Sequence, residues 1–344
     1  MAASICVVGG GVVGMMSAVN IAESLPSADV TVLADAFTPD TTSDVAAGFC
    51  FPHCLGDTPG HLVRVCSRWF GETVDHLLSV YKSPAAADAG VSMLTGYLMS
   101  ATTDTLNVAG RERTFGLRPM SAAELRVCGK TGGSGITFTT LLAEGGRLLP
   151  WLMDTFKATG GQLVRRKIMS LSELYDEFDV LVNCTGIGAN QLVRDETVQP
   201  VRGQLIMVSR HRHRHRHRHR HRQRHRHASQ TAINHVTLGG TEQEGNWNLS
   251  PVETDRERIW EGCVRLVPSL KGARVIADRV GLRPCRPTVR LERETGVQQG
   301  TTTPQIVHNY GHGGAGVSLS WGCALDTVQL VKDCVHDISC WRQT

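Results

Sequence analysis

The chain has 344 residues, of which 41% are hydrophobic and 36 are glycine, and it contains no run of 18 apolar residues. This composition is typical of a soluble α/β protein with many tight turns, and it argues against a membrane-spanning helix. The formal charge of +4 includes nine arginines in Arg210–His227, and the rest of the chain carries 4 − 9 = −5, so we expect no nucleic-acid-binding surface.

The first 48 residues predict a β-α-β unit. Ser4–Val8 is a short run rich in β-branched residues, which indicates a buried strand. Met15–Ser24 follows as a helix, and Val30–Leu33 is a second strand. The whole unit has the length of about 30 residues that is typical of a dinucleotide-binding motif.

A glycine motif joins the first strand to the helix. Gly9 permits a tight turn, Gly11 lets the backbone approach a pyrophosphate at the helix N-terminus, and Gly14 lets helix and strand pack closely. Asp35 stands 21 residues after Gly14, at the end of the second strand. A carboxylate there suits the unphosphorylated ribose of FAD or NAD better than that of NADP.

The rest of the chain alternates between helices and strands. Hydrophobic periodicity predicts helices over Thr58–Lys82 and Gly145–Ala158, and from about Leu319 to Val335 with Ser318 as N-cap. Short apolar runs predict strands at Val91–Met99, Asp179–Asn183, Val201–Val208, His235–Leu238 and Gln305–His308. Glycine turns follow strands at the N-terminus, near Gly186 and near Gly314, so we expect three segments to converge on one ligand.

The cysteines favour an intracellular protein with reduced thiols. There are 11, with no C-x-x-C pair and no secretory signal. Cys50, His53 and Cys54 lie close together in the sequence, but no second cluster completes a tetrahedral site. We therefore expect no metal.

Five separated motifs resemble the D-amino-acid oxidase family of FAD enzymes. They are DAFTPDTTSDVAAG (Asp35–Gly48), NCTGIGA (Asn183–Ala189), VRGQ (Val201–Gln204), GLRPCRPTVRLERE (Gly281–Glu294) and VHNYGHGGAG (Val307–Gly316). The resemblance covers Ile5 to about His336, except for the His-Arg tract. The segments PHCLGDTP (Pro52–Pro59), LGGTEQEGNWNLSP (Leu238–Pro251) and VPSLKGA (Val267–Ala273) are similar to the D-aspartate oxidase branch of the family.

The resemblance implies an α/β fold in which an FAD-binding Rossmann-like domain is intertwined with an α+β substrate domain built on a mixed sheet. The FAD-binding domain would comprise residues 1–48, 140–200 and 281–344, and the substrate domain residues 49–139 and 201–280, with the His-Arg insert at 209–228. The implied reaction is oxidation of D-amino acids, and the similarity to the D-aspartate branch favours acidic ones such as D-aspartate and D-glutamate. The α-hydrogen passes as hydride to the flavin, the imino acid hydrolyses to a 2-oxo acid and ammonia, and oxygen becomes hydrogen peroxide.

The resemblance also implies roles for individual residues. Arg283 matches the arginine that holds the substrate α-carboxylate, which a planar guanidinium can bind through two parallel bonds. Gly314 matches the position whose carbonyl faces the substrate amine, and His53 matches a histidine typical of the D-aspartate branch. The residues expected to bind FAD are Gly9, Gly11, Val12, Val13, Gly14, Asp35, Thr42, Ser43, Gly48, Ile168, Gly186, Gly313, Gly316, Val317 and Ser318.

Three features depart from the family. In the family, a loop at the position of Arg210–His227 closes over the substrate and supplies a tyrosine. The His-Arg tract has no apolar side chains, so we expect it to be poorly ordered. Without the loop, we expect the substrate site to be open on that side and the oxidase activity to be weak. D-aspartate oxidases resemble each other in having an arginine directly after the Gly-Gly-Thr turn, whereas this chain has Glu242 at that position. A carboxylate there would repel D-aspartate. The family location is peroxisomal, whereas the chain ends in Trp341–Thr344 rather than an S-K-L tripeptide, which leaves a cytoplasmic location open.

Other functions remain open at the level of sequence. The chain could be a neutral D-amino-acid oxidase, or an FAD-binding relic whose His-Arg tract binds metal or polyanions. An NAD-dependent dehydrogenase is a more distant alternative, since the Ser43–Gly48 turn and the C-terminal glycine run are unlike those of nicotinamide enzymes. For the oxidase, the expected partners are a small D-amino acid and oxygen, with no nucleic acid and no membrane.

Overall fold

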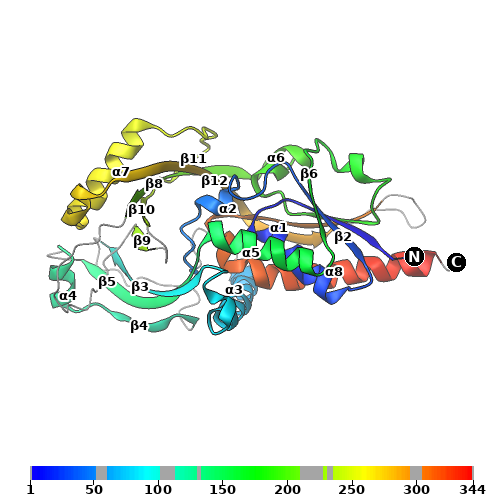
Figure 1. Ribbon diagram of the computed structural model, residues 1–344, viewed down its shortest axis with the longest axis horizontal. Coiled ribbons are helices and arrows are strands. Elements are labelled where there is room, and N and C mark those ends of the chain that lie inside the picture. The colour runs from blue at the N-terminus through cyan, green and yellow to red at the C-terminus, as the bar shows by residue number, and fades with distance from the viewer. Residues whose placement is uncertain are drawn as a thin grey trace.

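The computed structural model describes residues 2–51, 60–100, 113–129, 133–209, 228–230, 235–294 and 304–342. Its α-helices are α1 Val12–Ser24, α2 Thr42–Val45, α3 Gly60–Tyr81, α4 Ala122–Val127, α5 Gly145–Ala158, α6 Ala189–Leu192, α7 Glu253–Leu266 and α8 Gly316–Trp341. Its strands are β1 Ser4–Val8, β2 Asp29–Ala34, β3 Val91–Ser100, β4 Phe115–Pro119, β5 Ser134–Ala143, β6 Gln162–Arg165, β7 Val180–Asn183, β8 Gln199–Ser209, β9 Ala228–Gln230, β10 His235–Gly239, β11 Gln243–Glu244, β12 Val275–Arg293 and β13 Gln305–His312. At one end of the molecule α1, α5 and α8 gather on the sheet, and at the other α7 lies opposite β3, β4 and β5 (Figure 1).

A mixed sheet organises the described part of the chain. Its order is β6-β2-β1-β7-β13-β12-β8-β10-β9, with β11 beside β8. The pairs from β6 to β13 are parallel, and those that involve β12, β8 and β10 are antiparallel. The strands β1, β2 and β7 are short, largely apolar runs because other elements cover both of their faces, whereas β6 is mostly exposed at the edge of the sheet. The carboxyl ends of β1, β2, β7 and β13 meet at one edge, where open α/β sheets bind ligands. This is the predicted fold class.

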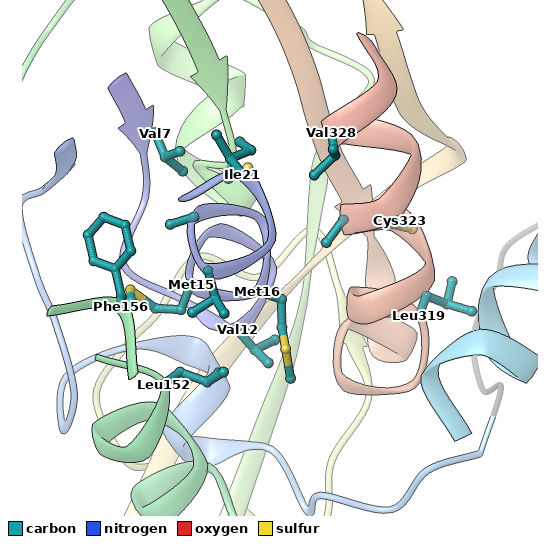
Figure 2. Close-up of a cluster of buried hydrophobic side chains, with 14 of the residues drawn as sticks. Val7, Val12, Met15, Met16, Ile21, Leu152, Phe156, Leu319, Cys323 and Val328 are labelled. Atoms are coloured by element: carbon teal, nitrogen blue, oxygen red, sulfur yellow. The ribbon is translucent and has the colours of Figure 1, made fainter. Parts of the chain in front are cut away.

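Helix α1 lies in the largest hydrophobic core. Met15, Met16 and Ile21 are fully buried, and Figure 2 shows the helix between α5, which contributes Leu152 and Phe156, and α8. Burial of each such side chain contributes roughly 1.5–3 kcal/mol. This packing holds in place the helix N-terminus that follows the glycine motif, and it confirms the predicted helix.

The opposite end of the molecule contains a helix and a second, smaller sheet, which the sequence predicted only in part. Helix α7 packs on β8 and β10 through a narrow apolar face that includes Ile259 and Cys263. The helix is otherwise rich in charged residues, which is why hydrophobic periodicity did not predict it. The smaller sheet has the order β3-β5-β4, and the predicted strand at Val91–Met99 is part of it.

Strand β12 is longer than its sequence suggests. It runs over 19 residues although it contains Pro284 and Pro287, which normally argue against a central strand. Its pairing with β13 shifts register between Cys285 and Arg290, so the irregular stretch contains Pro287. On the other side, Arg283 and Pro284 pair with β8 in regular register. The strand therefore connects the two ends of the molecule.

The expected N-cap of the last helix is wrong. Helix α8 begins at Gly316 with Ala315 as N-cap, so Ser318 lies within the first turn. The Ser318 hydroxyl is buried and accepts a hydrogen bond from the N–H of Phe51 at 2.9 Å. It also lies 2.9 Å from the carbonyl oxygen of Phe51. Ser318 thus connects the helix to the segment after Gly48 instead of capping its own helix.

Helix α3 confirms the predicted helix over Thr58–Lys82, within the bounds Gly60–Tyr81. The cysteines that the structure describes are free thiols, and most are buried. No helix among the described residues is both long enough and apolar enough to cross a membrane. His53 and residues 210–227 lie outside the described residues. The expectations for His53 and for the His-Arg tract therefore concern parts of the chain that the structure does not describe.

Candidate functional site

One long cavity of about 1580 Å³ passes the carboxyl ends of the parallel strands and continues to the walls formed by β3, β5 and α7. Of the residues that the sequence singled out, the cavity is lined by Gly9, Gly11, Val12, Val13, Asp35, Thr42, Ser43, Gly48, Ile168, Gly186, Arg283, Gly313, Gly314, Gly316 and Val317. Gly14 and Ser318 are not among the lining residues. All three glycine turns therefore reach the same space.

The first turn requires glycine at two positions. Gly9 has φ +126°, and a Cβ there would lie 2.4 Å from the carbonyl oxygen of Cys184. A Cβ on Gly14 would lie 1.9 Å from the carbonyl oxygen of Gly9. No side chain fits at either place, so the turn brings β1, α1 and the end of β7 into close backbone contact.

The N-terminus of α1 faces the cavity and is stabilised by a neighbouring segment. The N–H of Val12 donates to Ser43 Oγ at 3.0 Å. Ser43 belongs to the short helix α2, which Thr41 and Asp44 cap reciprocally. The first turn of α1 carries no acidic side chain, so the positive end of its dipole is available to an anion such as a phosphate.

The glycine after α2 is also fixed by backbone contact. Gly48 has φ +77°, and a Cβ there would lie 2.2 Å from the carbonyl oxygen of Ala143. Its own carbonyl accepts the N–H of Ala143 at 2.8 Å. Because no side chain stands at Gly48, the cavity wall here is backbone, against which a flat ring can pack closely.

A carboxylate stands at the far end of this half of the cavity. Asp35 is exposed, directly after β2, and its carbonyl accepts Arg165 Nε at 3.0 Å. Ile168 lines the same end of the cavity from the segment after β6. A glycine cradle, a positive helix end and a terminal carboxylate along one continuous cavity fit an extended dinucleotide such as FAD.

Arg283 lies at the other end, on the wall formed by β12 and β8. It is half-buried, and its Nη1 donates to the carbonyl oxygen of Thr241 at 3.2 Å. The guanidinium passes across Gly203, where a Cβ would lie 2.9 Å from Nη1. Gly313 and Gly314 line the same cavity at the end of β13. A carboxylate could reach Arg283 from within the cavity and form charge-assisted hydrogen bonds.

The next two arginines after Arg283 on β12, Arg286 and Arg290, are each held by an ion pair. Arg286 Nε lies 3.0 Å from Asp195, and Arg290 donates to the Tyr310 hydroxyl at 2.8 Å. Burial opposes ionisation of Asp195, but hydrogen bonds from Thr197, Tyr310 and Arg286 outweigh it and lower the pKa of Asp195 to about 2. Among the β12 arginines in the described structure, the cavity is lined by Arg283.

Several lining residues were not predicted from the sequence. Thr241 and Gly203 surround the Arg283 guanidinium, and Tyr97 and Phe138 contribute from β3 and β5. No site role was assigned to these residues from the sequence, because they meet only when distant strands pair. Glu242, which the sequence did single out, also lines the cavity directly after Thr241.

His312 ends β13 at the junction of the two halves and lines the cavity. Burial lowers the pKa of His312 to about 4, so the imidazole is neutral near pH 7. Its Nε2 lies 3.4 Å from Cys323 Sγ, and burial raises the pKa of that thiol well above its ordinary value of 9.0. This histidine therefore adds no charge to the site.

The match to the FAD dependent oxidoreductase family model covers residues 4–330. The chain is 43% identical to human D-aspartate oxidase, over 97% of this chain and 96% of that protein. It is 36% identical to a D-amino-acid oxidase of Streptomyces coelicolor, over 95% of this chain and 96% of the relative.

Solved structures agree on the fold. Glycine oxidase from Bacillus cereus aligns with a TM-score of 0.70 at 15% identity, over 96% of this chain and 97% of that one. An L-alpha-glycerophosphate oxidase from Mycoplasma pneumoniae with FAD bound aligns with a TM-score of 0.70 at 13% identity, over 96% and 95%. The higher identity to D-aspartate oxidase than to the bacterial D-amino-acid oxidase supports the D-aspartate oxidase branch. The chain belongs to the D-amino-acid oxidase family of FAD-dependent oxidoreductases, and FAD is its cofactor.

Proposed function

We propose that this chain oxidises D-amino acids, with D-aspartate and D-glutamate as the first candidates. Amino acid, oxygen and water would give the 2-oxo acid, ammonia and hydrogen peroxide. The observation that carries this proposal is the guanidinium of Arg283, on the wall of the cavity that the FAD motifs also line. The identity of 43% to human D-aspartate oxidase supports the choice of acidic substrates.

Bound FAD supplies the two-electron acceptor for the oxidation at the substrate α-carbon. Arg283 would bind the α-carboxylate and fix the orientation of the substrate. The carbonyl of Gly314 would accept a hydrogen bond from the substrate amine, and His53, which lies outside the described residues, is proposed for substrate binding by family resemblance. The protein would thus contribute mainly by orienting the substrate.

The cofactor-binding residues are proposed by position along the cavity. The N–H groups at the start of α1 would hold the pyrophosphate, Asp35 the ribose and Ile168 the adenine. The first turn of α8, Gly316 to Ser318, would direct N–H groups to the carbonyl end of the flavin. The remaining proposed contacts are Gly9, Gly11, Val12, Val13, Gly14, Thr42, Ser43, Gly48, Gly186 and Gly313.

The decisive experiment is peroxide release by the FAD-loaded protein with D-aspartate, D-glutamate and D-alanine, and with L-aspartate as the control. We expect peroxide from at least one D-amino acid and none from L-aspartate. A protein that holds FAD but releases no peroxide with any of them would contradict the proposal and favour an FAD-binding relic.

Glu242 favours a second candidate, oxidation of neutral D-amino acids. Its position on the cavity wall places a carboxylate where it would repel an acidic side chain. Glu242→Gln should raise kcat/KM for D-aspartate relative to D-alanine by about tenfold, or about 1.4 kcal/mol. An unchanged ratio between the two substrates would show that Glu242 does not select against acids.

Two coarser proposals accompany the reaction. The chain would divide into an FAD-binding domain of residues 1–48, 140–200 and 281–344 and a substrate domain of residues 49–139 and 201–280. The boundary between residues 280 and 281 falls within β12, and the boundaries at 139/140 and 200/201 fall within β5 and β8, so the two domains would share these strands. Family resemblance supports a peroxisomal location, which imaging of the full chain in cells would test.

A further inference from the structure

The strand segment 201–204 presents different chemistry on its two faces. Arg202 and Gln204 are buried and point to one side, as alternate residues of a strand do. Gly203 lines the cavity on the other side, where the Arg283 guanidinium passes across it. The same short segment therefore contacts the substrate wall and the structure behind it.

Behind the strand, Arg202 is fully buried and makes five hydrogen bonds. Nε donates to the Asn248 carbonyl, Nη1 to Gln243 Oε1 and Asp255 Oδ2, and Nη2 to Gln204 Oε1 and the Ser250 carbonyl, at distances of 2.7 to 3.0 Å. A guanidinium has five N–H donors, so its capacity is used completely. All but one of these acceptors lie between residues 243 and 255. Arg202 thus fastens the segment after Thr241 to β8.

Thr241 connects this network to the site. Its hydroxyl accepts the N–H of Gln204 at 2.9 Å, and its own N–H donates to the Gln204 carbonyl at 3.3 Å. Its carbonyl accepts Arg283 Nη1 at 3.2 Å. The backbone N–H and carbonyl of Gln204 therefore hold Thr241, and with it the carbonyl that accepts the hydrogen bond from Arg283.

Gly203 packs closely against the same guanidinium and leaves no space for a side chain at this position. A Cβ at this position would lie 2.9 Å from Nη1, 3.0 Å from Nη2 and 3.1 Å from Cζ of Arg283. These atoms are the end of a flexible side chain, so a methyl group would displace them rather than disrupt the strand. Gly203 does not have a left-handed backbone, so alanine is sterically allowed there by the main chain.

We propose that Gly203 and Thr241 are positioning residues that together fix the Arg283 guanidinium for the substrate α-carboxylate. Arg202 and Gln204 hold Thr241 in place. The inference rests on the proposed function, in which Arg283 binds that carboxylate. It adds that the position of the guanidinium, and not only its charge, is built into the pairing of β8 with β12 and the Thr241 turn.

The first test replaces Gly203 with alanine. Gly203→Ala should lower kcat/KM for the best D-amino acid by about 10- to 100-fold, mainly through KM, because misplacement of a positioning group by about 1 Å has effects of that order. Binding of propionate, followed by the absorbance of bound FAD, should weaken about tenfold, whereas propionamide, which has no charge, should bind as before. Gly146→Ala is the matched control, since a Cβ there meets nothing within 4 Å.

A second pair of variants tests the network if Gly203→Ala does not fold. Thr241→Val removes the hydroxyl that accepts the Gln204 N–H, and Thr241→Ser keeps it. We expect Thr241→Val to weaken propionate binding about tenfold and Thr241→Ser to restore it to within about threefold. A purely structural role would lower the unfolding temperature without changing the ratio of propionate to propionamide affinity.

The outcomes separate the inference from the function beneath it. If Arg283→Ala abolishes propionate binding while Gly203→Ala and Thr241→Val bind it as the wild type does, the positioning inference is wrong and the proposed function stands. If Arg283→Ala still binds propionate normally, the proposed role of Arg283 fails, whatever the other variants do.

Discussion

Close backbone contacts of glycines shape the cofactor end of the cavity, whereas the charged side chains of Arg283 and Glu242 line the substrate end. At the cofactor end, Gly9, Gly48 and Gly313 have positive φ, and added Cβ atoms at Gly9 and Gly48 would meet backbone carbonyl groups. At the substrate end, the wall includes the side chains of Arg283 and Glu242. A backbone cradle tolerates almost no added atom, while a wall of side chains can change its chemistry and leave the fold intact.

The sharpest test of this contrast is a single methyl group at the cofactor end. Gly9→Ala places a Cβ 2.4 Å from the Cys184 carbonyl oxygen, at φ +126°. Backbone strain and overpacking together should cost about 2–6 kcal/mol of unfolding free energy, with loss of bound FAD. Urea denaturation and flavin absorbance measure the two effects. Gly146→Ala is the control, and it should be neutral or stabilise the protein by up to about 1 kcal/mol.

The contrast predicts the reverse pattern at the substrate end. Arg283→Ala should weaken substrate binding by roughly 2–5 kcal/mol, because the α-carboxylate loses a charged partner in the cavity. FAD content and unfolding free energy should change little, since Arg283 is half-buried and donates a hydrogen bond to the carbonyl oxygen of Thr241. Steady-state kinetics with D-amino acids measure the first effect. Loss of FAD from this variant would show that the two ends are not separable.

The same contrast explains what the sequence could predict. Gly9, Gly11, Gly14 and Asp35 lie within one local β-α-β unit, so their spacing alone indicates the turn, the helix end and the terminal carboxylate. The structure places three of these residues along one cavity and Gly14 beneath the turn, against Gly9. Local motifs of this kind are readable because the chain that forms the site is continuous.

The substrate end is assembled from distant segments, and there the sequence alone was insufficient. Arg283 was given a substrate role through a family resemblance, whereas Thr241 and Gly203 lie within segments that carry the resemblance but were given no role, because their importance arises from the pairing of β8 with β10 and β12. Helix α7 was missed because its apolar face is narrow, and the extent of β12 because prolines interrupt it. Ser318 was assigned to a cap because its true partners, Phe49 and Phe51, are far away in sequence.

His312 lies where the two ends meet, and it predicts a pH dependence of stability. Burial lowers its pKa from 6.5 to about 4 in the folded protein. Between those values the unfolded chain binds a proton that the folded protein does not, so stability is lost as the pH falls from 6.5 to 4. The difference, 6.5 − 4 = 2.5, corresponds to about 3 kcal/mol.

The variant His312→Gln isolates this contribution. Urea denaturation of both proteins between pH 7 and pH 4.5 should show a steeper loss of stability in the wild type. His76, whose pKa burial also lowers to about 4, is present in both proteins and cancels in the difference. Parallel pH profiles for the two proteins would mean that His312 is protonated in the folded state at higher pH than its burial implies.

The smallest expected effect comes from the exposed end of the cofactor half. Asp35→Asn removes a carboxylate that would accept ribose hydroxyl groups, but the group is exposed and water competes for the same bonds. FAD affinity should therefore fall only about 3- to 10-fold, or about 1 kcal/mol, as measured by titration of the apoprotein with FAD. Asp29→Asn is the matched control, because Asp29 is exposed at the opposite end of the same strand.

A loss of about 3- to 10-fold would mean that side chains at the cofactor end contribute modestly to FAD affinity, whereas the glycine backbone there is essential for binding. Equal losses of affinity in Asp35→Asn and Asp29→Asn would point instead to the overall charge of the protein. A loss well above tenfold in Asp35→Asn alone would show that one side chain at this end matters nearly as much as the glycine turn. The contrast between a backbone cradle and a side-chain wall would then hold only for the pyrophosphate and flavin portions of the cavity.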